Sequence, residues 1–395
     1  MDATYRSLLR NREFNALLGS QLATVVSLSV SGLVIGIIVN DKTGSPLLTA
    51  LSMFTPALAN IIGGATLMSL ADTASPRPAM TVLQIVSAAL VGFQAFPLPI
   101  AGRFALLIAG GAVSAVAGGI RFGILSELVP NDAYAPARSL LNIVNSAMQI
   151  VGFAFGATLV AYVDNRVTFI GGSVVMLLGA AAIRFRVRDH SVRMPSPPSI
   201  KQTWAVNRWL VQQPNARVVI CLLWVPNGLI VGCESLFIPY AGSGGGYLLT
   251  AGAIGMLISD LFVARALSSV GRRRINLFQR FLLAAPYLGF LFVPNVVAAA
   301  FLVFVSSIGF SASLGLQETL VRLTPSANLG QVQGVESSGR IACQGLGAFV
   351  SGSLAEAISV PLVMAIMACV SIVVTLAAWL PMRRVESEVP LVCRA

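Results

Sequence analysis

The segment FNALLGSQLATVVSLSVSGLVIGIIV, residues 14–39, decides the fold of this chain, because its 26 positions hold no charged residue. A hydrocarbon core about 30 Å thick is crossed by about 20 helical residues, so the segment is long enough to span a membrane. Eleven more apolar segments follow it. The full set is expected near 14–39, 47–70, 79–98, 103–126, 138–162, 167–184, 218–240, 247–268, 275–293, 296–321, 332–357 and 360–381. Backbone groups in lipid must pair within their own segment. The sequence therefore predicts an all-α polytopic membrane protein with twelve transmembrane helices.

Composition agrees with this prediction. Apolar residues make up 56% of the chain, charged residues 10%, and the mean hydropathy is +0.83. An ordinary soluble domain is about 25% charged. Because the length alone would fit two or three soluble domains, it is the hydropathy that excludes them.

The net charge of +11 is distributed unevenly along the chain. With the spans above, 21 of the 26 Lys and Arg residues fall on the side that both termini share. Lys42, Arg103 and Arg166 fall on the other side. Positive charge gathers on the cytoplasmic side of membrane proteins, which predicts a multi-pass protein of the plasma membrane with both termini cytoplasmic. This asymmetry explains the basic charge without a nucleic-acid partner.

The chain contains an internal repeat. Leu128 and Pro130 recur as Leu323 and Pro325, at an offset of 195 (323 − 128 = 325 − 130). We therefore expect an N-terminal six-helix half at 1–184, a cytoplasmic linker at 185–217, and a C-terminal half with a short tail at 218–395. Internal repeats of this kind are typical of secondary transporters.

Three motifs resemble a known family: Leu8-Leu9-Arg10-Asn11-Arg12-Glu13-Phe14, Thr43-Gly44-Ser45-Pro46-Leu47-Leu48-Thr49-Ala50 and Glu127-Leu128-Val129-Pro130. Over essentially its whole length the chain resembles the major facilitator superfamily, and most closely its bacterial drug and macrolide efflux group. The resemblance implies two pseudo-symmetric six-helix bundles, with a small-molecule substrate, protons and the lipid bilayer as partners. It also implies a monomer without a cofactor.

The superfamily has a latch in the loop between helices two and three, which here keeps Asp72 and Arg77, and the second half repeats it as Gly271-Arg272-Arg273-Arg274. The resemblance implies that Asp72, Arg77, Arg272 and Arg273 join the halves, with Asp72 facing the helix that begins near Gln331. A solvated loop aspartate is the alternative. The antiporter signature of helix five is present only in part, as Gly152-Phe153-Ala154-Phe155-Gly156-Ala157.

Charges inside the spans are candidates for function, because each costs at least about 2.5 kcal/mol near the bilayer centre. Asp260 lies about 16 Å along its helix from Gly271, and Glu234 about 9 Å from Tyr240. We predict that Glu234 and Asp260 bind protons or substrate. A neutral carboxylic acid hydrogen-bonded between helices is the alternative.

Two further pairs of opposite charges lie at nearly equivalent depths in the two halves. The repeat offset takes position 121 to 316, close to Glu318, and position 127 to 322 (121 + 195 = 316; 127 + 195 = 322). We predict that Arg121 with Glu318, and Glu127 with Arg322, close a cytoplasmic gate. Glu336 and Arg340 are spaced i, i+4 on one helix, which favours a local ion pair.

Polar residues with little charge are expected to line a central cavity, which suits an amphipathic substrate. These residues are Gln21, Ser27, Ser31, Asn227 and Gln317. Pro226 is expected to break the hydrogen bonding of its helix locally.

The motifs favour a secondary active transporter over an enzyme. With two lysines the chain offers no Walker A motif, and its sole histidine, His190, lies in the linker. We predict no metal, no cofactor and no catalytic residues, and proton-coupled efflux of an amphipathic drug, antibiotic or secondary metabolite by alternating access. The alternatives are an importer on the same fold, a transport-silent receptor or subunit, and a membrane-embedded transferase.

Overall fold

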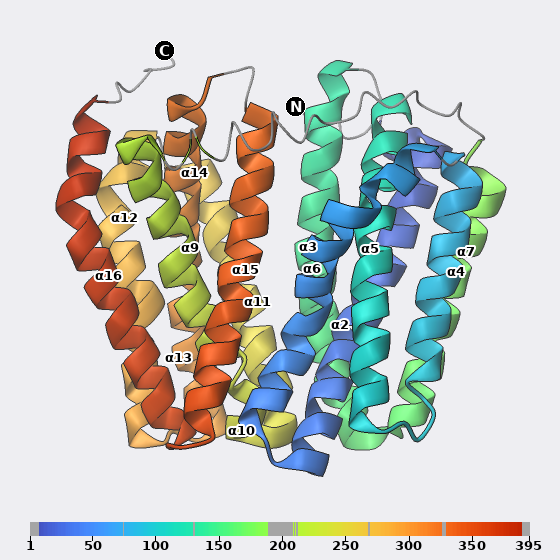
Figure 1. Ribbon diagram of the computed structural model, residues 1–395, viewed down its shortest axis with the longest axis horizontal. Helices are drawn as coiled ribbons and strands as arrows, with labels where there is room; N and C mark the ends of the chain where they lie inside the picture. Colours follow the sequence, from blue (N-terminus) through green and yellow to red (C-terminus); the bar gives the residue numbers. More distant parts are fainter. Residues whose placement is uncertain are drawn as a thin grey trace. The chain divides into compact units, whose positions relative to one another are not determined.

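A computed structural model describes residues 8–73, 75–128, 131–188, 208, 210, 212–267, 269–325 and 329–388. These described residues form helices and no strand (Figure 1). The chain divides into two compact units, one made of Met1–Lys42 with Ser52–Pro197 and the other of Thr43–Leu51 with Pro198–Ala395. The sequence-based boundaries at 184 and 217 stay a prediction, since most of the expected linker lies outside the described residues.

The helices that lie wholly or mostly in the first unit are α2 (Arg12–Thr43), α3 (Pro46–Thr73, with its residues up to Leu51 in the second unit), α4 (Pro76–Phe93), α5 (Ile100–Leu128), α6 (Asn131–Tyr162) and α7 (Asn165–Arg186). Those of the second unit are α9 (Pro214–Glu234), α10 (Phe237–Ala241), η1 (Gly242–Gly244), α11 (Gly245–Ala266), α12 (Ser269–Ala284), η2 (Ala285–Phe292), α13 (Val296–Ile308), η3 (Gly309–Ser311), α14 (Ala312–Leu323), α15 (Leu329–Ala355) and α16 (Val360–Glu388). Each of the twelve predicted segments overlaps a helix.

Local chemistry sets where several helices begin. Asn11 precedes α2 and accepts hydrogen bonds from the backbone N–H groups of Glu13 (2.9 Å) and Phe14 (3.2 Å). Asp164 precedes α7 and accepts from the Arg166 N–H at 2.7 Å. Such side chains satisfy N–H groups that the first helical turn leaves free. The helices α4 and α9 begin with proline, which has no such group to satisfy.

Close helix packing depends on glycine in both units. A Cβ atom on Gly111 of α5 would lie 2.3 Å from the backbone oxygen of Pro56 in α3. In the second unit, a Cβ on Gly347 of α15 would lie 2.0 Å from the backbone oxygen of Gly228 in α9. Only glycine allows these backbones to approach so closely, as small residues do at many transmembrane helix interfaces.

Two predicted spans differ from simple helices, because each changes to 3₁₀ geometry. The span predicted at 275–293 becomes η2 after Ala284, and that at 296–321 is interrupted by η3. At Gly309 a Cβ would lie 2.4 Å from the backbone oxygen of Gln279 and the backbone nitrogen of Leu283. The interruption at η3 is therefore the place where this span contacts the backbone of α12.

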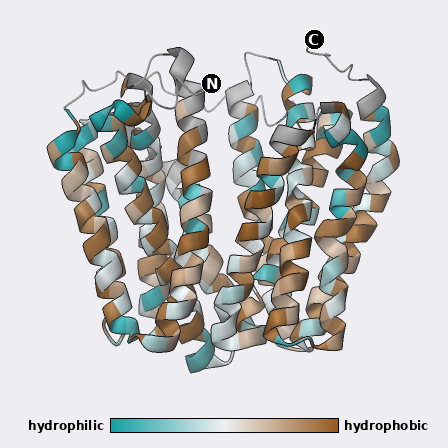
Figure 2. Cartoon of the chain, turned by 180° about the vertical axis from the view of Figure 1, so that it is seen from behind, coloured by the Kyte–Doolittle hydropathy of each residue, from teal (hydrophilic) through white to brown (hydrophobic). Residues whose placement is uncertain are grey.

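Ten stretches of the described chain are long and apolar enough to cross a membrane, and one of them, Pro214–Val263, runs from α9 through α10 and η1 into α11. Figure 2 shows the hydrophobic residues along the helices and many hydrophilic residues near their ends. The long helix α15 is not among these stretches, because it is less apolar than the others. It carries Glu336 and Arg340 within its length, and these two charges account for part of the difference.

Candidate functional site

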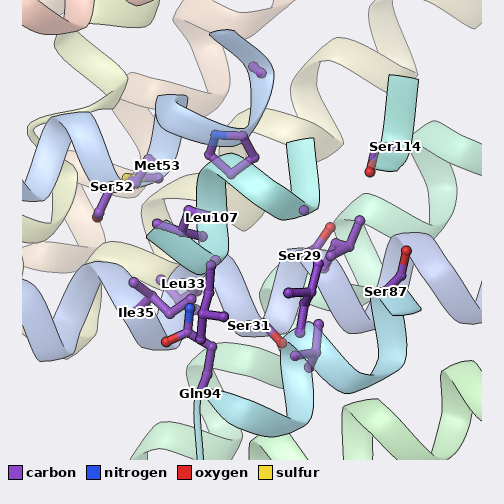
Figure 3. A pocket seen from close by; sticks show the side chains of 18 of the residues that line it. Ser29, Ser31, Leu33, Ile35, Ser52, Met53, Ser87, Gln94, Leu107 and Ser114 are labelled. Atoms are coloured by element: carbon purple, nitrogen blue, oxygen red, sulfur yellow. The ribbon is translucent and has the colours of Figure 1, made fainter. Parts of the chain in front are cut away.

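The first unit encloses a cavity of about 290 Å³ between α2, α3, α4, α5 and α6. Figure 3 shows it from close by, with labelled side chains that come from α2, α3, α5 and the end of α4. Among the described residues, its lining contains no Asp, Glu, Lys or Arg. The polar residues that line it are Ser29, Ser31, Ser52, Ser87, Gln94, Ser114 and Gln149, set among Leu, Ile, Val, Met and Phe side chains.

Ser31 is the polar residue of this cavity with the clearest capacity for a ligand. Its residue is 4% exposed, and its hydroxyl has no hydrogen-bond partner among the described residues. Gln94, in contrast, is already engaged, because its amide donates to the Arg103 carbonyl at 3.2 Å and accepts from the Arg103 guanidinium at 3.1 Å. A small uncharged molecule with a polar group could satisfy the Ser31 hydroxyl, since buried polar groups are normally paired.

Two residues predicted to line a cavity have partners elsewhere in the first unit. Ser27 is 2% exposed and donates to the Gly172 carbonyl of α7 at 3.0 Å. Gln21 donates to Asn145 of α6 at 2.5 Å. Neither lines the cavity described above, whereas Ser31 does.

Glu234 is the last residue of α9 and lies next to an aromatic cluster. One of its carboxylate oxygens, Oε1, is buried without a hydrogen-bond partner among the described residues. It lies close enough to Tyr287 to interact with it electrostatically. Tyr287 in turn stacks on Phe237 and Phe290, with ring centroids 6.3 and 5.7 Å apart. A carboxyl group in such apolar surroundings is a candidate to bind a proton.

Asp260 has a different setting, because its side chain is exposed on α11. Ile258 and Phe262 are 50% and 63% exposed, and form an apolar face of the kind that contacts lipid. Asp260 is two residues from each of them, which places it about 160° from both around the helix at about 100° per residue. The carboxyl group is therefore accessible from a face other than the apolar one.

Glu318 forms an ion pair within the second unit. Its carboxylate accepts from Arg272 at 2.5 Å, and the Arg272 guanidinium also donates to the Leu267 carbonyl at the end of α11. This contact joins α12 to α14. Glu318 therefore has a partner other than the predicted Arg121. Arg272, which the family resemblance assigns to the latch between the halves, here forms an ion pair within the second unit. The predicted contact of Arg121 with Glu318 stays a prediction.

Pro226 lies inside α9, which continues from Pro214 to Glu234, and it interrupts the hydrogen bonding of this helix at one carbonyl, as expected from the sequence. Proline has no N–H for the carbonyl four residues before it, which is that of Leu222. Arg280 of α12 donates to this carbonyl at 3.2 Å and to Asn276 at 2.8 Å. Arg280 is 5% exposed. The count of basic residues by side assigned Arg280 only a role in topology, although it lies inside the span predicted at 275–293.

The structure describes most of the remaining predicted residues. Glu336 and Arg340 form the expected local ion pair at 3.0 Å. Arg121 is half-buried on α5 with its Nε unpaired among the described residues, and Asn227 accepts from Gln344 at 2.7 Å. Gln317, Arg77, Arg273 and Arg322 are half-buried on α14, α4, α12 and α14. The side chains of Asp72 and Glu127 lie outside the described residues.

The apolar helices define a multi-pass membrane protein, and comparison with known proteins gives its family. Residues 17–316 match the family model of the Major Facilitator Superfamily. The chain belongs to this superfamily. It is similar to an uncharacterized MFS-type transporter of Bacillus subtilis (strain 168), YfiS, with 24% identity over 372 residues that cover 89% of this chain and 88% of the relative.

Solved structures share the fold at low identity. A mutant of the nucleoside transporter NupG has a TM-score of 0.76 and 12% identity, over 94% of this chain and 99% of that one. A bacterial homolog of the human lysosomal transporter Spinster has a TM-score of 0.72 and 14% identity, over 97% and 99%. The xylose transporter XylE from E. coli has a TM-score of 0.68 and 14% identity, over 93% and 95%. The chain therefore has the major facilitator fold, and it is a secondary transporter of this type.

Sequence reasoning missed Arg280 and most of the cavity lining. Ser52, Ser87 and Ser114 stand alone in apolar segments, and only the packing of α3, α4 and α5 brings them to one cavity. Arg280 carries a recognisable signal, because a single arginine lies six residues beyond the basic run Arg272–Arg274 and inside a predicted span.

Proposed function

We propose that this transporter exports an uncharged, amphipathic small molecule in exchange for protons. The observation that carries the proposal is the cavity of the first unit, whose described lining combines apolar walls with several hydroxyl and amide groups and has no charged residue. Such a lining suits a molecule with a few polar groups on an apolar body.

The proton is assigned to the carboxyl groups of the second unit. Asp260 is accessible on a face of α11 other than its apolar one, and Glu234 has an unpaired buried oxygen. Intramembrane acidic residues commonly serve as proton relays in transporters. Asp260 is the first choice because its side chain is exposed on α11, away from the apolar face of that helix.

The driving force is sufficient for efflux. One proton moving through about 100 mV contributes about 2.3 kcal/mol, and one pH unit adds about 1.4 kcal/mol. At one proton per molecule, the sum holds a gradient of about 500-fold for a neutral substrate.

Transport by the purified protein in liposomes with an imposed pH gradient tests this proposal. The panel contains uncharged amphipathic antibiotics, lipophilic cations and, because solved relatives carry them, a nucleoside and xylose. We expect accumulation of an uncharged amphipathic compound that a protonophore abolishes. Accumulation in the opposite direction would identify an importer, and no pH-dependent movement of any compound would refute the proposal.

Two variants locate the proton. Asp260→Asn is expected to lose accumulation driven by the pH gradient while keeping counterflow of substrate between equal pH values. Asp41→Asn is the matched control, because Asp41 is an exposed carboxylate near the end of α2. If both Asp260→Asn and Glu234→Gln kept normal pH-driven accumulation, the assignment of the proton would be wrong.

A further inference from the structure

Three basic residues that the sequence assigns only a role in topology meet at one cavity of the first unit. Lys42, Arg103 and Arg166 are the Lys and Arg residues predicted on the side away from the termini. All three line a cavity of about 320 Å³ at the end of α2, the loop between α4 and α5, and the start of α7. We propose that this cavity binds a phosphate-type oxyanion, and that the headgroup of an anionic lipid supplies it.

The charges of the lining are not balanced. Against three cations the cavity has one carboxylate, that of Asp164, which leaves a net charge of +2 (3 − 1). Asp164 already accepts from the Arg166 backbone N–H as the cap of α7. The positive end of the α7 helix dipole lies at the same place and favours an anion further.

Arg103 is the buried cation of this group. It is 5% exposed, and its guanidinium donates to the Gln94 carbonyl at 3.0 Å, the Gln94 side chain at 3.1 Å and the Phe96 carbonyl at 3.4 Å. All these acceptors are neutral, and its Nε has no partner among the described residues. A buried cation is normally compensated by an opposite charge. A bound oxyanion would supply that charge.

The geometry also suits recognition of a phosphate. Hydrogen bonds to Gln94 and Phe96 fix Arg103 against the loop between α4 and α5. Lys42 and Arg166 are exposed on α2 and α7, so their side chains can approach a ligand from two sides. Guanidinium groups match the geometry of phosphate oxygens, and an ammonium group adds a compact charge.

Apolar side chains beside the cations favour a lipid as the source. Ile38, Phe96 and Phe169 line the same cavity. Phe96 is 52% exposed, although it lies next to a charged site. Basic pockets beside apolar surface are typical sites for anionic headgroups.

Thermal unfolding of the full-length protein in neutral detergent tests the proposal, with three ligands titrated separately. These are short-chain phosphatidylglycerol, short-chain phosphatidylcholine and inorganic phosphate. Since binding to the folded state raises Tm, we expect phosphatidylglycerol to raise it more than phosphatidylcholine does. A rise with inorganic phosphate equal to that with phosphatidylglycerol would support the oxyanion site and make free phosphate its source.

The variant Lys42→Gln/Arg166→Gln removes two charges from exposed side chains and leaves Arg103 with its loop. At about 1 kcal/mol per basic residue, the apparent affinity is expected to fall about 30-fold. Arg184→Gln is the control, because Arg184 is exposed in the last turn of the same helix, α7. The proposal is overturned if no ligand raises Tm, or if the double variant responds as the control does.

Discussion

In the first unit, Ser31 of α2 lines a cavity and its hydroxyl has no partner among the described residues, whereas the second unit has Pro226 at the equivalent position of α9 (31 + 195 = 226). There Arg280 donates to the carbonyl that the proline leaves free. The two units thus use the first helix of the repeat in different ways. One leaves a polar group available for a ligand, and the other uses its polar groups to join helices.

The third helix of the repeat shows what the units still share. In the first unit Gln84, which is 2% exposed, donates from α4 to Thr24 of α2 at 2.7 Å. In the second unit the residue at the repeat offset is Gln279 (84 + 195 = 279), and its neighbour Arg280 donates from α12 to α9. Both units therefore join the same two helices with a buried polar side chain.

The largest effect on stability is expected from removing the buried guanidinium group of Arg280 in the second unit. Arg280→Met leaves the Leu222 carbonyl and the Asn276 side chain without their donor, and should lower the free energy of unfolding by about 3 kcal/mol. Pro226→Ala restores an N–H for Leu222, so Arg280→Met should cost about 1 kcal/mol less in that background. Thermal unfolding of the four proteins checks the coupling. Equal costs in both backgrounds would show that Arg280 does not act through this carbonyl.

The next largest effect on stability is expected at the close backbone contact between Gly347 and Gly228 in the second unit. Gly347→Ala places a Cβ against the Gly228 backbone, and should destabilise the protein by about 2 kcal/mol through overpacking. Gly334→Ala on the same helix is the control, because nothing lies within 4 Å of its added Cβ. We expect that control to be neutral or slightly stabilising, since alanine favours helix. Similar melting temperatures for both variants would contradict the packing argument.

A charge exchange distinguishes the two partners considered for Glu318. Arg272→Gln should slow transport by about tenfold, equivalent to about 1.4 kcal/mol. The exchange Arg272→Glu/Glu318→Arg should restore part of the rate if the observed pair is the functional one. Initial rates in liposomes measure both variants. Recovery by Arg121→Glu/Glu318→Arg instead would favour the gate predicted from the sequence.

The smallest effect compares two serines of α2. Ser27→Ala removes a hydrogen bond to the Gly172 carbonyl and should cost about 1 kcal/mol. Ser31→Ala removes a hydroxyl without a partner and should leave the melting temperature unchanged or raise it, while it weakens substrate binding. Unfolding and substrate titration on the same samples provide the test. A larger loss of stability in Ser31→Ala would mean that its hydroxyl is not available for a ligand.

The sequence predicted the helices well, because the thickness of the hydrocarbon core leaves a clear mark in each apolar segment. It also predicted the ion pair of Glu336 with Arg340, which depends only on spacing along one helix. Contacts between helices were harder to predict. Nothing in the spacing of Arg280 indicates that it reaches Leu222, and Lys42 and Arg166 meet only because the ends of α2 and α7 line one cavity.

The change of α12 into the 3₁₀ segment η2 bears on how this part of the chain can cross a membrane. A 3₁₀ helix rises about 2.0 Å per residue, against about 1.5 Å in an α-helix. The 8 residues of η2 therefore extend about 16 Å, where an α-helix would reach about 12 Å. With three residues per turn, Tyr287 also lies over Phe290, as their stacked rings show. A segment of 24 residues, 269–292 (16 + 8), thus reaches as far as an α-helix about three residues longer, and it places the rings of Tyr287 and Phe290 one above the other.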